Sequence, residues 1–130
     1  MINHKVTLSC GAIFGALAVV AGAFAAHSLK LYLTESSLSI WQTAVKYQMY
    51  HSLALIAIAI LMKLQTEDQS SGWLKASTIA FIIGVILFSG SLYVLSLTTI
   101  SWLGVITPIG GLSLIIGWIC LAIVPWKTSD

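Results

Sequence analysis

Four long apolar runs, separated by short polar segments, dominate the pattern of this chain. As α-helices of about 20 residues each, such runs cross the roughly 30 Å hydrocarbon core of a bilayer. No Asp, Glu or Arg lies inside any of them. We therefore predict an all-α fold, an integral membrane bundle of four transmembrane helices in a single domain of residues 1–130. The spans cover about residues 6–26, 44–62, 74–97 and 103–124.

Lysines at the ends of the runs predict the orientation of the bundle. More of them fall on the side of the two termini than on the other side. In order, these are Lys5, Lys63, Lys75 and Lys127 against Lys30 and Lys46. Cytoplasmic loops of membrane proteins carry the excess of basic residues, so both termini are expected in the cytoplasm. A polar loop with Glu67 and Asp68 is expected between the second and third spans.

The first run ends in Ala23, Phe24 and Ala25, which also resembles a signal-peptidase site. The run is longer than the roughly 7 to 15 residues of a signal core, and further spans follow it. We therefore expect it to be a membrane helix and keep a cleaved signal as the alternative.

Composition supports the membrane class and narrows the partners. Hydrophobic residues make up 58% of the chain and charged residues 8%, far below the roughly 25% charged residues of soluble domains. So short a chain leaves little polypeptide for a separate soluble module, so function must lie in the bundle or its loops. The net charge is only +2, without a basic cluster; we expect membrane lipids as partners and no nucleic acid.

Small residues recur on the predicted helices and suggest close helix packing. Gly11 and Gly15 form a G-x-x-x-G pattern, which lets membrane helices approach closely. Two interpretations are open, packing within the bundle or contact in a homo-oligomer. The predicted packing residues are Gly11, Gly15, Gly22, Ser89, Gly90, Ser91, Pro108, Gly110, Gly111 and Gly117.

Pro108 lies about five residues into the fourth run. Thr107 is placed to cap a helix that starts with proline in its first turn. This pattern predicts a non-helical entry over residues 103–106.

A cluster of polar side chains leads into the second span. On a helix, Gln42, Lys46 and Tyr50 share one face, and Tyr47 and His51 lie near the opposite one. Such a turn lies at headgroup level or is enclosed by other helices. It is either an interfacial anchor, or a pocket in which the Lys46 ammonium binds an anionic headgroup or small ligand. The full candidate set is His27, Lys30, Gln42, Lys46, Tyr47, Gln48, Tyr50 and His51.

Catalytic and metal chemistry find little support in the sequence. His27 and His51 have no thiol or carboxylate beside them at ligand spacing. The serines of residues 88–93 have no base spaced to activate them. We expect no enzyme activity, no catalytic residue, no metal and no cofactor.

Four sequence blocks together resemble one known family. They are residues 22–30, 41–51, 88–93 and 106–111, followed by Gly117 and Trp118. In their order and spacing they resemble the YgdD/YwdK-like family of small four-span bacterial membrane proteins, domain-of-unknown-function family four-two-three. One departure is Ala25, where that family often has Gly. The resemblance implies four transmembrane helices, a bacterial cytoplasmic-membrane location and no established enzymatic activity, with some relatives linked to membrane integrity and stress tolerance.

Three functional hypotheses follow. The leading one is a structural or lipid-interacting role in membrane integrity or stress tolerance. A second is a small oligomeric transporter or channel; because the spans hold no carboxylate, proton coupling would have to use His51 or His27. A third is an accessory subunit that binds a larger membrane complex through the glycine face of the first span.

Overall fold

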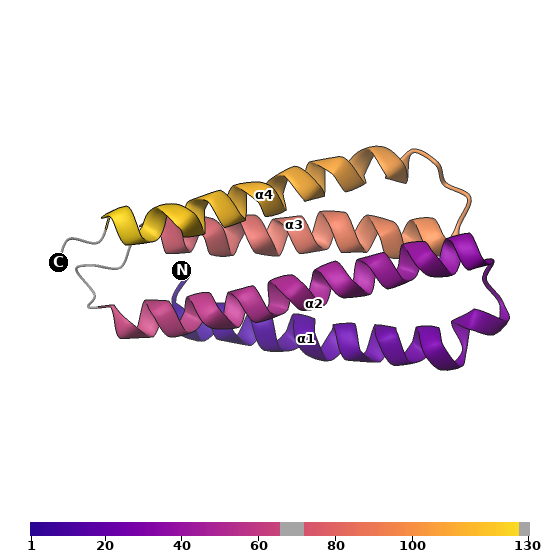
Figure 1. The fold of residues 1–130 in the computed structure, drawn as a ribbon, viewed down its shortest axis with the longest axis horizontal. Coiled ribbons are helices and arrows are strands. Elements are labelled where there is room, and N and C mark those ends of the chain that lie inside the picture. The colour runs from indigo at the N-terminus through magenta and orange to yellow at the C-terminus, as the bar shows by residue number, and fades with distance from the viewer. Residues whose placement is uncertain (66–71, 128–130) are drawn as a thin grey trace.

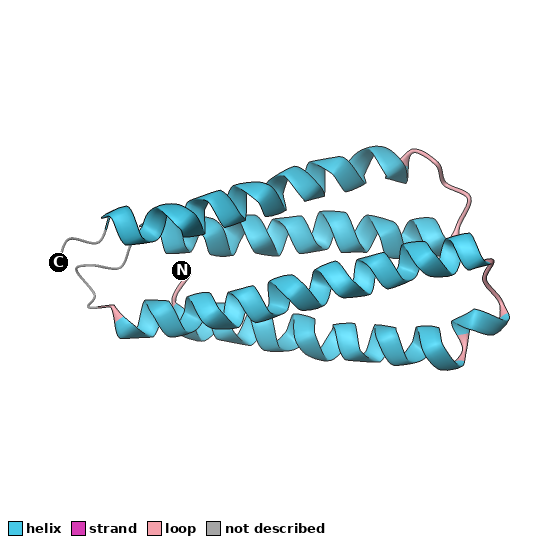
Figure 2. Cartoon of the chain, in the orientation of Figure 1, coloured by secondary structure: helices cyan, strands magenta, loops and turns pink. Residues whose placement is uncertain are grey.

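The computed structural model describes residues 1–65 and 72–127, and these fold into helices joined by short loops (Figures 1 and 2). Each of the four long helices is long and apolar enough to cross a membrane, which confirms the predicted all-α, four-span fold. The predicted loop with Glu67 and Asp68 lies outside the described residues. The elements are α1 (His4–His27), the short 3-10 helix η1 (Leu29–Leu31), α2 (Glu35–Leu64), α3 (Gly72–Leu97) and α4 (Leu103–Lys127).

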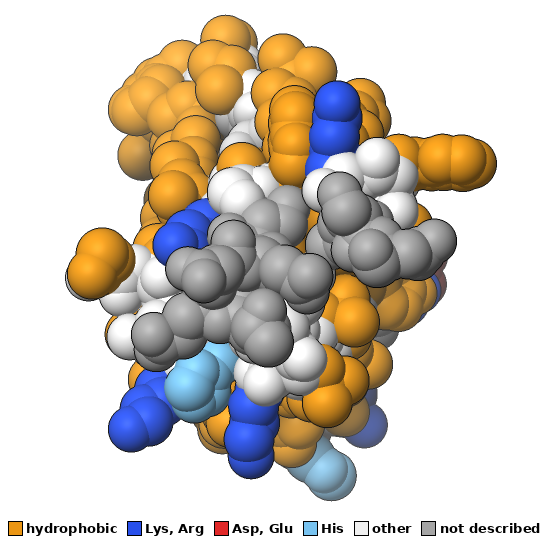
Figure 3. Space-filling model, turned by 90° about the vertical axis from the view of Figure 1, so that its left-hand side faces the viewer, with side chains coloured by type: hydrophobic (Ala, Val, Ile, Leu, Met, Phe, Trp, Pro, Cys, Tyr) orange, Lys and Arg blue, Asp and Glu red, His pale blue; other side chains and the backbone are white. Residues whose placement is uncertain are grey.

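The helices pack in the order of the chain. Helix α1 lies against α2, α2 against α3, and α3 against α4 (Figure 1). Each pair of neighbours is antiparallel, so the start of α1 and the end of α4 lie at the same end of the bundle (Figure 1). Figure 3 shows that end of the bundle, where lysine and histidine side chains lie among hydrophobic ones. Helix α4 packs mainly on α3, whereas α2 packs on both α1 and α3.

Side-chain caps set the starts of the first two long helices. The Asn3 side chain accepts a hydrogen bond from the Val6 amide at 3.0 Å, and Thr34 Oγ1 accepts one from the Ser37 amide at 3.2 Å. Because Thr34 caps α2, this helix begins well before the apolar run that starts near residue 44. At 1.5 Å per residue its 30 residues span about 45 Å, so α2 is longer than the hydrocarbon core is thick.

Glycines allow close approach of α4 to α3. A Cβ on Gly110 would overlap the Phe88 backbone, and one on Gly117 would lie 2.5 Å from the Phe81 ring. Gly84, which the sequence patterns did not single out, is equally tight against Leu114. These contacts keep the helices close around a buried cluster of apolar side chains.

The G-x-x-x-G pattern of α1 packs on α2 of the same chain. A Cβ on Gly11 would lie 3.0 Å from the Ser52 carbonyl oxygen, and one on Gly15 would lie 2.7 Å from Ser52 Oγ. Gly22 and Gly111 make ordinary contacts with neighbouring helices, whereas a Cβ on Gly90 would meet no atom within 4 Å. Gly90 is therefore not needed for close packing within the described chain.

The predicted non-helical entry at residues 103–106 is wrong, because α4 is helical from Leu103. Its first turn is tightened by bonds to the carbonyl three residues earlier, such as that from the Gly104 amide to Ser101 O at 3.0 Å. Proline has no amide hydrogen to donate to the carbonyl four residues earlier; for Pro108 that residue is Gly104, which is exposed. Thr107 is not the cap; its hydroxyl pairs with Ser91 Oγ at 2.7 Å.

Candidate functional site: a lateral cleft between α2 and α4

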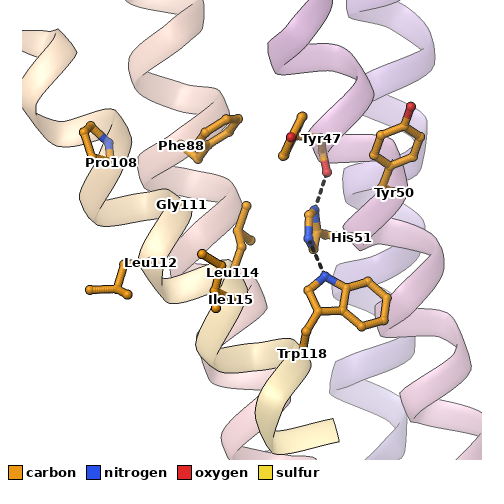
Figure 4. Close-up of a pocket in the computed structure, with 10 residues that line it drawn as sticks. All are labelled: Tyr47, Tyr50, His51, Phe88, Pro108, Gly111, Leu112, Leu114, Ile115 and Trp118. Carbon is orange, nitrogen blue, oxygen red and sulfur yellow. Dashed lines mark hydrogen bonds between the residues drawn. The ribbon is translucent and has the colours of Figure 1, made fainter. Parts of the chain in front are cut away.

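A cleft of about 740 Å³ opens on the side of the bundle between α2 and α4 (Figure 4). Helix α2 forms one wall, α4 forms the other, and Phe88 of α3 lies between them. The two walls are helices that are long and apolar enough to cross a membrane. Its lining residues are Tyr47, Tyr50, His51, Phe88, Pro108, Gly111, Leu112, Leu114, Ile115 and Trp118.

A hydrogen bond joins the two walls at one end of the cleft. Trp118 Nε1 of α4 donates to His51 Nε2 of α2 at 3.1 Å. An indole N–H only donates, so Nε2 is the acceptor nitrogen of a neutral imidazole. Nδ1 therefore carries the proton and donates it to the Tyr47 carbonyl at 2.6 Å. Both nitrogens of His51 are thus satisfied within the protein, and the ring is only 4% exposed.

Aromatic rings continue the α2 wall onto α3 and α4. The Phe81 ring lies 5.1 Å from the centroid of His51 and 5.1 Å from that of Trp118. Toward the other end of the cleft, the Tyr47 and Phe88 rings are 4.6 Å apart. These separations are in the range where aromatic pairs attract each other, and the rings that line the cleft come from α2, α3 and α4.

Two tyrosine hydroxyls are the free polar groups of the cleft. Tyr47 is 40% exposed and Tyr50 56% exposed, and their ring centroids are 6.0 Å apart. Within residues 1–65 and 72–127, neither hydroxyl has a hydrogen-bond partner. With His51 neutral, none of the ten lining residues carries a charge. The cleft is thus apolar and uncharged, with hydroxyl groups on one wall.

The polar residues that the sequence predicted as one candidate site lie in different places in the structure. Tyr47, Tyr50 and His51 line the cleft. Gln42 and Lys46 line a different hollow of about 160 Å³ against α1, and His27 and Lys30 are exposed. Lys46 therefore does not share a pocket with Tyr50, although both lie on the face that helical periodicity gave them.

Gln48 is a buried link between helices. Its Nε2 donates to the Phe14 carbonyl of α1 at 2.9 Å, and its Oε1 accepts from the Tyr93 hydroxyl of α3 at 2.8 Å. Trp41 adds a bond from its indole N–H to the Ala21 carbonyl at 2.9 Å. These side chains hold α1, α2 and α3 together.

Serine hydroxyls also join neighbouring helices. Each donates to a backbone carbonyl of an adjacent helix at 2.7 or 2.8 Å. The pairs are Ser52 with Gly11, Ser77 with Gly117, Ser89 with Ala44, and Ser113 with Ala80. Within the described chain, no three His, Cys, Asp or Glu side chains gather as a metal-binding group.

Sequence reasoning missed most of the α4 wall of the cleft, since it named only Pro108 and Gly111 there, and those as packing residues. Trp118 was noted only as part of a family block, and Ile115 had no polar or small-residue signal. Their approach to α2 depends on how both helices pack on α3, which no local pattern encodes.

Comparison with known proteins places the chain among bacterial membrane proteins. The family model described as "Protein of unknown function (DUF423)" matches residues 21–111. The chain belongs to the DUF423 family. The DUF423 match runs from the second half of α1 into α4; it includes the α2 wall of the cleft and ends at Gly111, before Trp118. The family resemblance expected from the four sequence blocks is confirmed.

Relatives of this DUF423 protein match it over nearly its whole length. The UPF0382 membrane protein YwdK of Bacillus subtilis is 44% identical over 125 residues, which are 95% of this chain and 98% of the relative. UPF0382 membrane proteins of Staphylococcus aureus and Staphylococcus haemolyticus are 44% identical over 124 residues, 95% of this chain and 97% of each relative. No solved structure matches the chain significantly.

Proposed function

We propose that this protein binds a membrane lipid in the cleft between α2 and α4 and thereby contributes to the integrity of the bacterial cytoplasmic membrane. The observation that carries this proposal is the cleft itself, an uncharged hollow of about 740 Å³ that opens sideways among membrane-spanning helices. Its size lies within the roughly 300–1,000 Å³ of small-molecule sites. The role is one of binding, without a catalytic step.

The depth of the cleft favours a ligand that is dissolved in the bilayer. His51 lies near the middle of α2 (Glu35–Leu64), well inside the membrane. The surface of the cleft is apolar, with Leu112 58% exposed and Ile115 57% exposed. Side chains exposed in this region face lipid chains, so a lipid enters from the side without crossing a polar barrier.

The interhelical hydrogen bonds of the serines favour a stable helix bundle and argue against a channel. The serines that would line an aqueous path instead donate to backbone carbonyls of neighbouring helices. Hydrogen bonds of this kind and small residues are what hold membrane helices together. The excess of lysines at the end of the bundle that holds the start of α1 and the end of α4 favours that end in the cytoplasm.

Native mass spectrometry of the gently extracted protein tests this function. Ile115→Trp places an indole in the cleft, whereas Ile109→Trp is a matched control on α4, since Ile109 does not line the cleft and both isoleucines are 57% exposed. Wild type and the control should retain one lipid more than the Ile115 variant. Equal lipid retention by all three proteins would contradict lipid binding in the cleft.

A further inference from the structure

We propose that the ligand of the cleft is an uncharged lipid with a planar ring headgroup that carries carbonyl oxygens, a molecule of the quinone class. This inference rests on the proposed lipid-binding function and specifies its ligand. It is carried by the joint presence of an uncharged lining, an aromatic wall and unpartnered hydroxyl donors.

The charge of the lining favours an uncharged headgroup. None of the ten residues around the cleft is charged with His51 neutral. The lysine nearest in the sequence, Lys46, lines a separate hollow with Gly22 and Ala25 of α1. A phosphate in the cleft would have no cation among the lining residues, and a charge in an apolar medium is costly. A phospholipid headgroup therefore matches the cleft poorly.

The aromatic rings that line the cleft, from α2, α3 and α4, favour a ligand with a planar ring. Tyr47 and Phe88 present rings with centroids 4.6 Å apart, and the indole of Trp118 lies 5.9 Å from the imidazole of His51. Figure 4 shows these rings around the hollow between the helices. His51 is buried, so the faces open to a flat ligand are those of exposed rings such as Tyr47 and Trp118.

The available donors favour a ligand with acceptor oxygens. His51 and Trp118 already bond to each other, so their nitrogens are not free for a ligand. The hydroxyls of Tyr47 and Tyr50, which have no partner in the described chain, are the remaining side-chain donors. Ring carbonyl oxygens would accept from these hydroxyls, so a ligand with such acceptors gains hydrogen bonds that a purely apolar ligand does not.

The α4 wall and the open side of the cleft accommodate a long chain. Pro108, Leu112 and Ile115 offer apolar contact next to the ring position. Because the cleft opens toward lipid, a chain longer than the cleft continues into the bilayer. The same opening lets the ligand exchange with the membrane pool.

The test compares binding of decyl-benzoquinone with binding of phosphatidylglycerol and phosphatidylethanolamine to the delipidated full-length protein, by native mass spectrometry. The variants are Ile115→Trp, Ile109→Trp, the pair Tyr47→Phe with Tyr50→Phe, and Tyr32→Phe as the tyrosine control, since Tyr32 is 82% exposed and outside the cleft. Circular dichroism and size-exclusion chromatography first establish that each variant is folded.

We expect the quinone to bind wild type, Ile109→Trp and Tyr32→Phe alike. Ile115→Trp should abolish this binding, and the tyrosine pair variant should weaken it about tenfold, the value of one lost hydrogen bond of about 1.4 kcal/mol. The quinone proposal would be overturned if the tyrosine pair variant bound the quinone as well as wild type does. It would also be overturned if Ile115→Trp reduced the binding of phospholipid but not of quinone. Either result would leave the lipid-binding cleft in place. Binding of both ligand types that ignores Ile115→Trp would overturn the lipid cleft as well.

Discussion

Trp118 of α4 donates its indole N–H to Nε2 of His51 on α2 at 3.1 Å. In the described chain this hydrogen bond connects two helices that otherwise meet mainly through α3. It fixes the imidazole in its Nδ1–H form, because the indole requires an acceptor. The bond closes one end of the cleft, so cleft geometry and bundle stability depend on the same pair.

Removing the indole donor should destabilise the protein modestly. Trp118→Phe keeps an aromatic ring but leaves His51 Nε2 without its donor. Side-chain hydrogen bonds in membrane proteins contribute about 0.6 kcal/mol on average and up to about 1.7, so we expect a loss of about 1 kcal/mol, measured by reversible unfolding in mixed detergent micelles. Trp102→Phe, at a 62% exposed position, is the control and should leave the unfolding free energy unchanged. A Trp118 variant as stable as wild type would refute the role of the bond.

Close approach of α3 and α4 at Gly110 gives a second prediction. A Cβ at this position would overlap the Phe88 backbone, which cannot move aside like a flexible side chain. Gly110→Ala should therefore lower the free energy of unfolding by about 1–3 kcal/mol. On the same helix, a Cβ on Gly104 would meet no atom within 4 Å, so Gly104→Ala should leave stability unchanged or raise it by up to about 1 kcal/mol. Equal effects of the two substitutions would contradict the packing described for α4.

The contact between Gly15 and Ser52 predicts a coupled pair of substitutions. Gly15→Ala places a methyl group 2.7 Å from Ser52 Oγ but 3.9 Å from its Cβ. In a Ser52→Ala background the Oγ is gone, so the same methyl group should fit. A double-mutant cycle of unfolding free energies should give a coupling of at least about 0.5 kcal/mol, with Ser52→Ala suppressing the Gly15 defect. Strictly additive effects on the unfolding free energy would contradict the close contact between α1 and α2 at Gly15 and Ser52.

Gln48 should matter for stability where Gln42 does not. Gln48→Leu removes bonds to the Phe14 carbonyl and the Tyr93 hydroxyl and should cost about 1–2 kcal/mol. The matched substitution Gln42→Leu alters an exposed side chain and should change the unfolding free energy by less than about 0.5 kcal/mol. The comparison uses the same unfolding measurement, and a larger effect at Gln42 would reverse the structural assignment.

The sequence predicts the spans well because membrane helices need long apolar segments, whatever their neighbours. It also predicts that Gly11 and Gly15 suit close packing, but it leaves open whether the partner is another chain. The structure places Ser52 of the same chain against them. Such a choice depends on the approach of two helices, which local periodicity does not contain.

The candidate site was only partly predictable for the same reason. Helical periodicity correctly separates His51 from Lys46, yet it does not say which helix each will face. His51 meets Trp118 from a helix that is 67 residues away in the sequence, while Lys46 turns to α1. At Pro108 the proline rule overestimated the disruption, because i to i−3 bonds in the first turn keep the chain helical.

The central claim is that a lipid occupies the cleft between α2 and α4, and photo-crosslinking in native membranes tests it most directly. A lipid with a photoreactive group in its apolar chain is incorporated, and the crosslinked residues are mapped by peptide mass spectrometry. We predict labelling concentrated on Tyr47, Tyr50 and Ile115, strongly reduced in Ile115→Trp, and weak on outward residues of α1 such as Val19, which is 61% exposed. Uniform labelling around the bundle, unchanged in that variant, would contradict the claim.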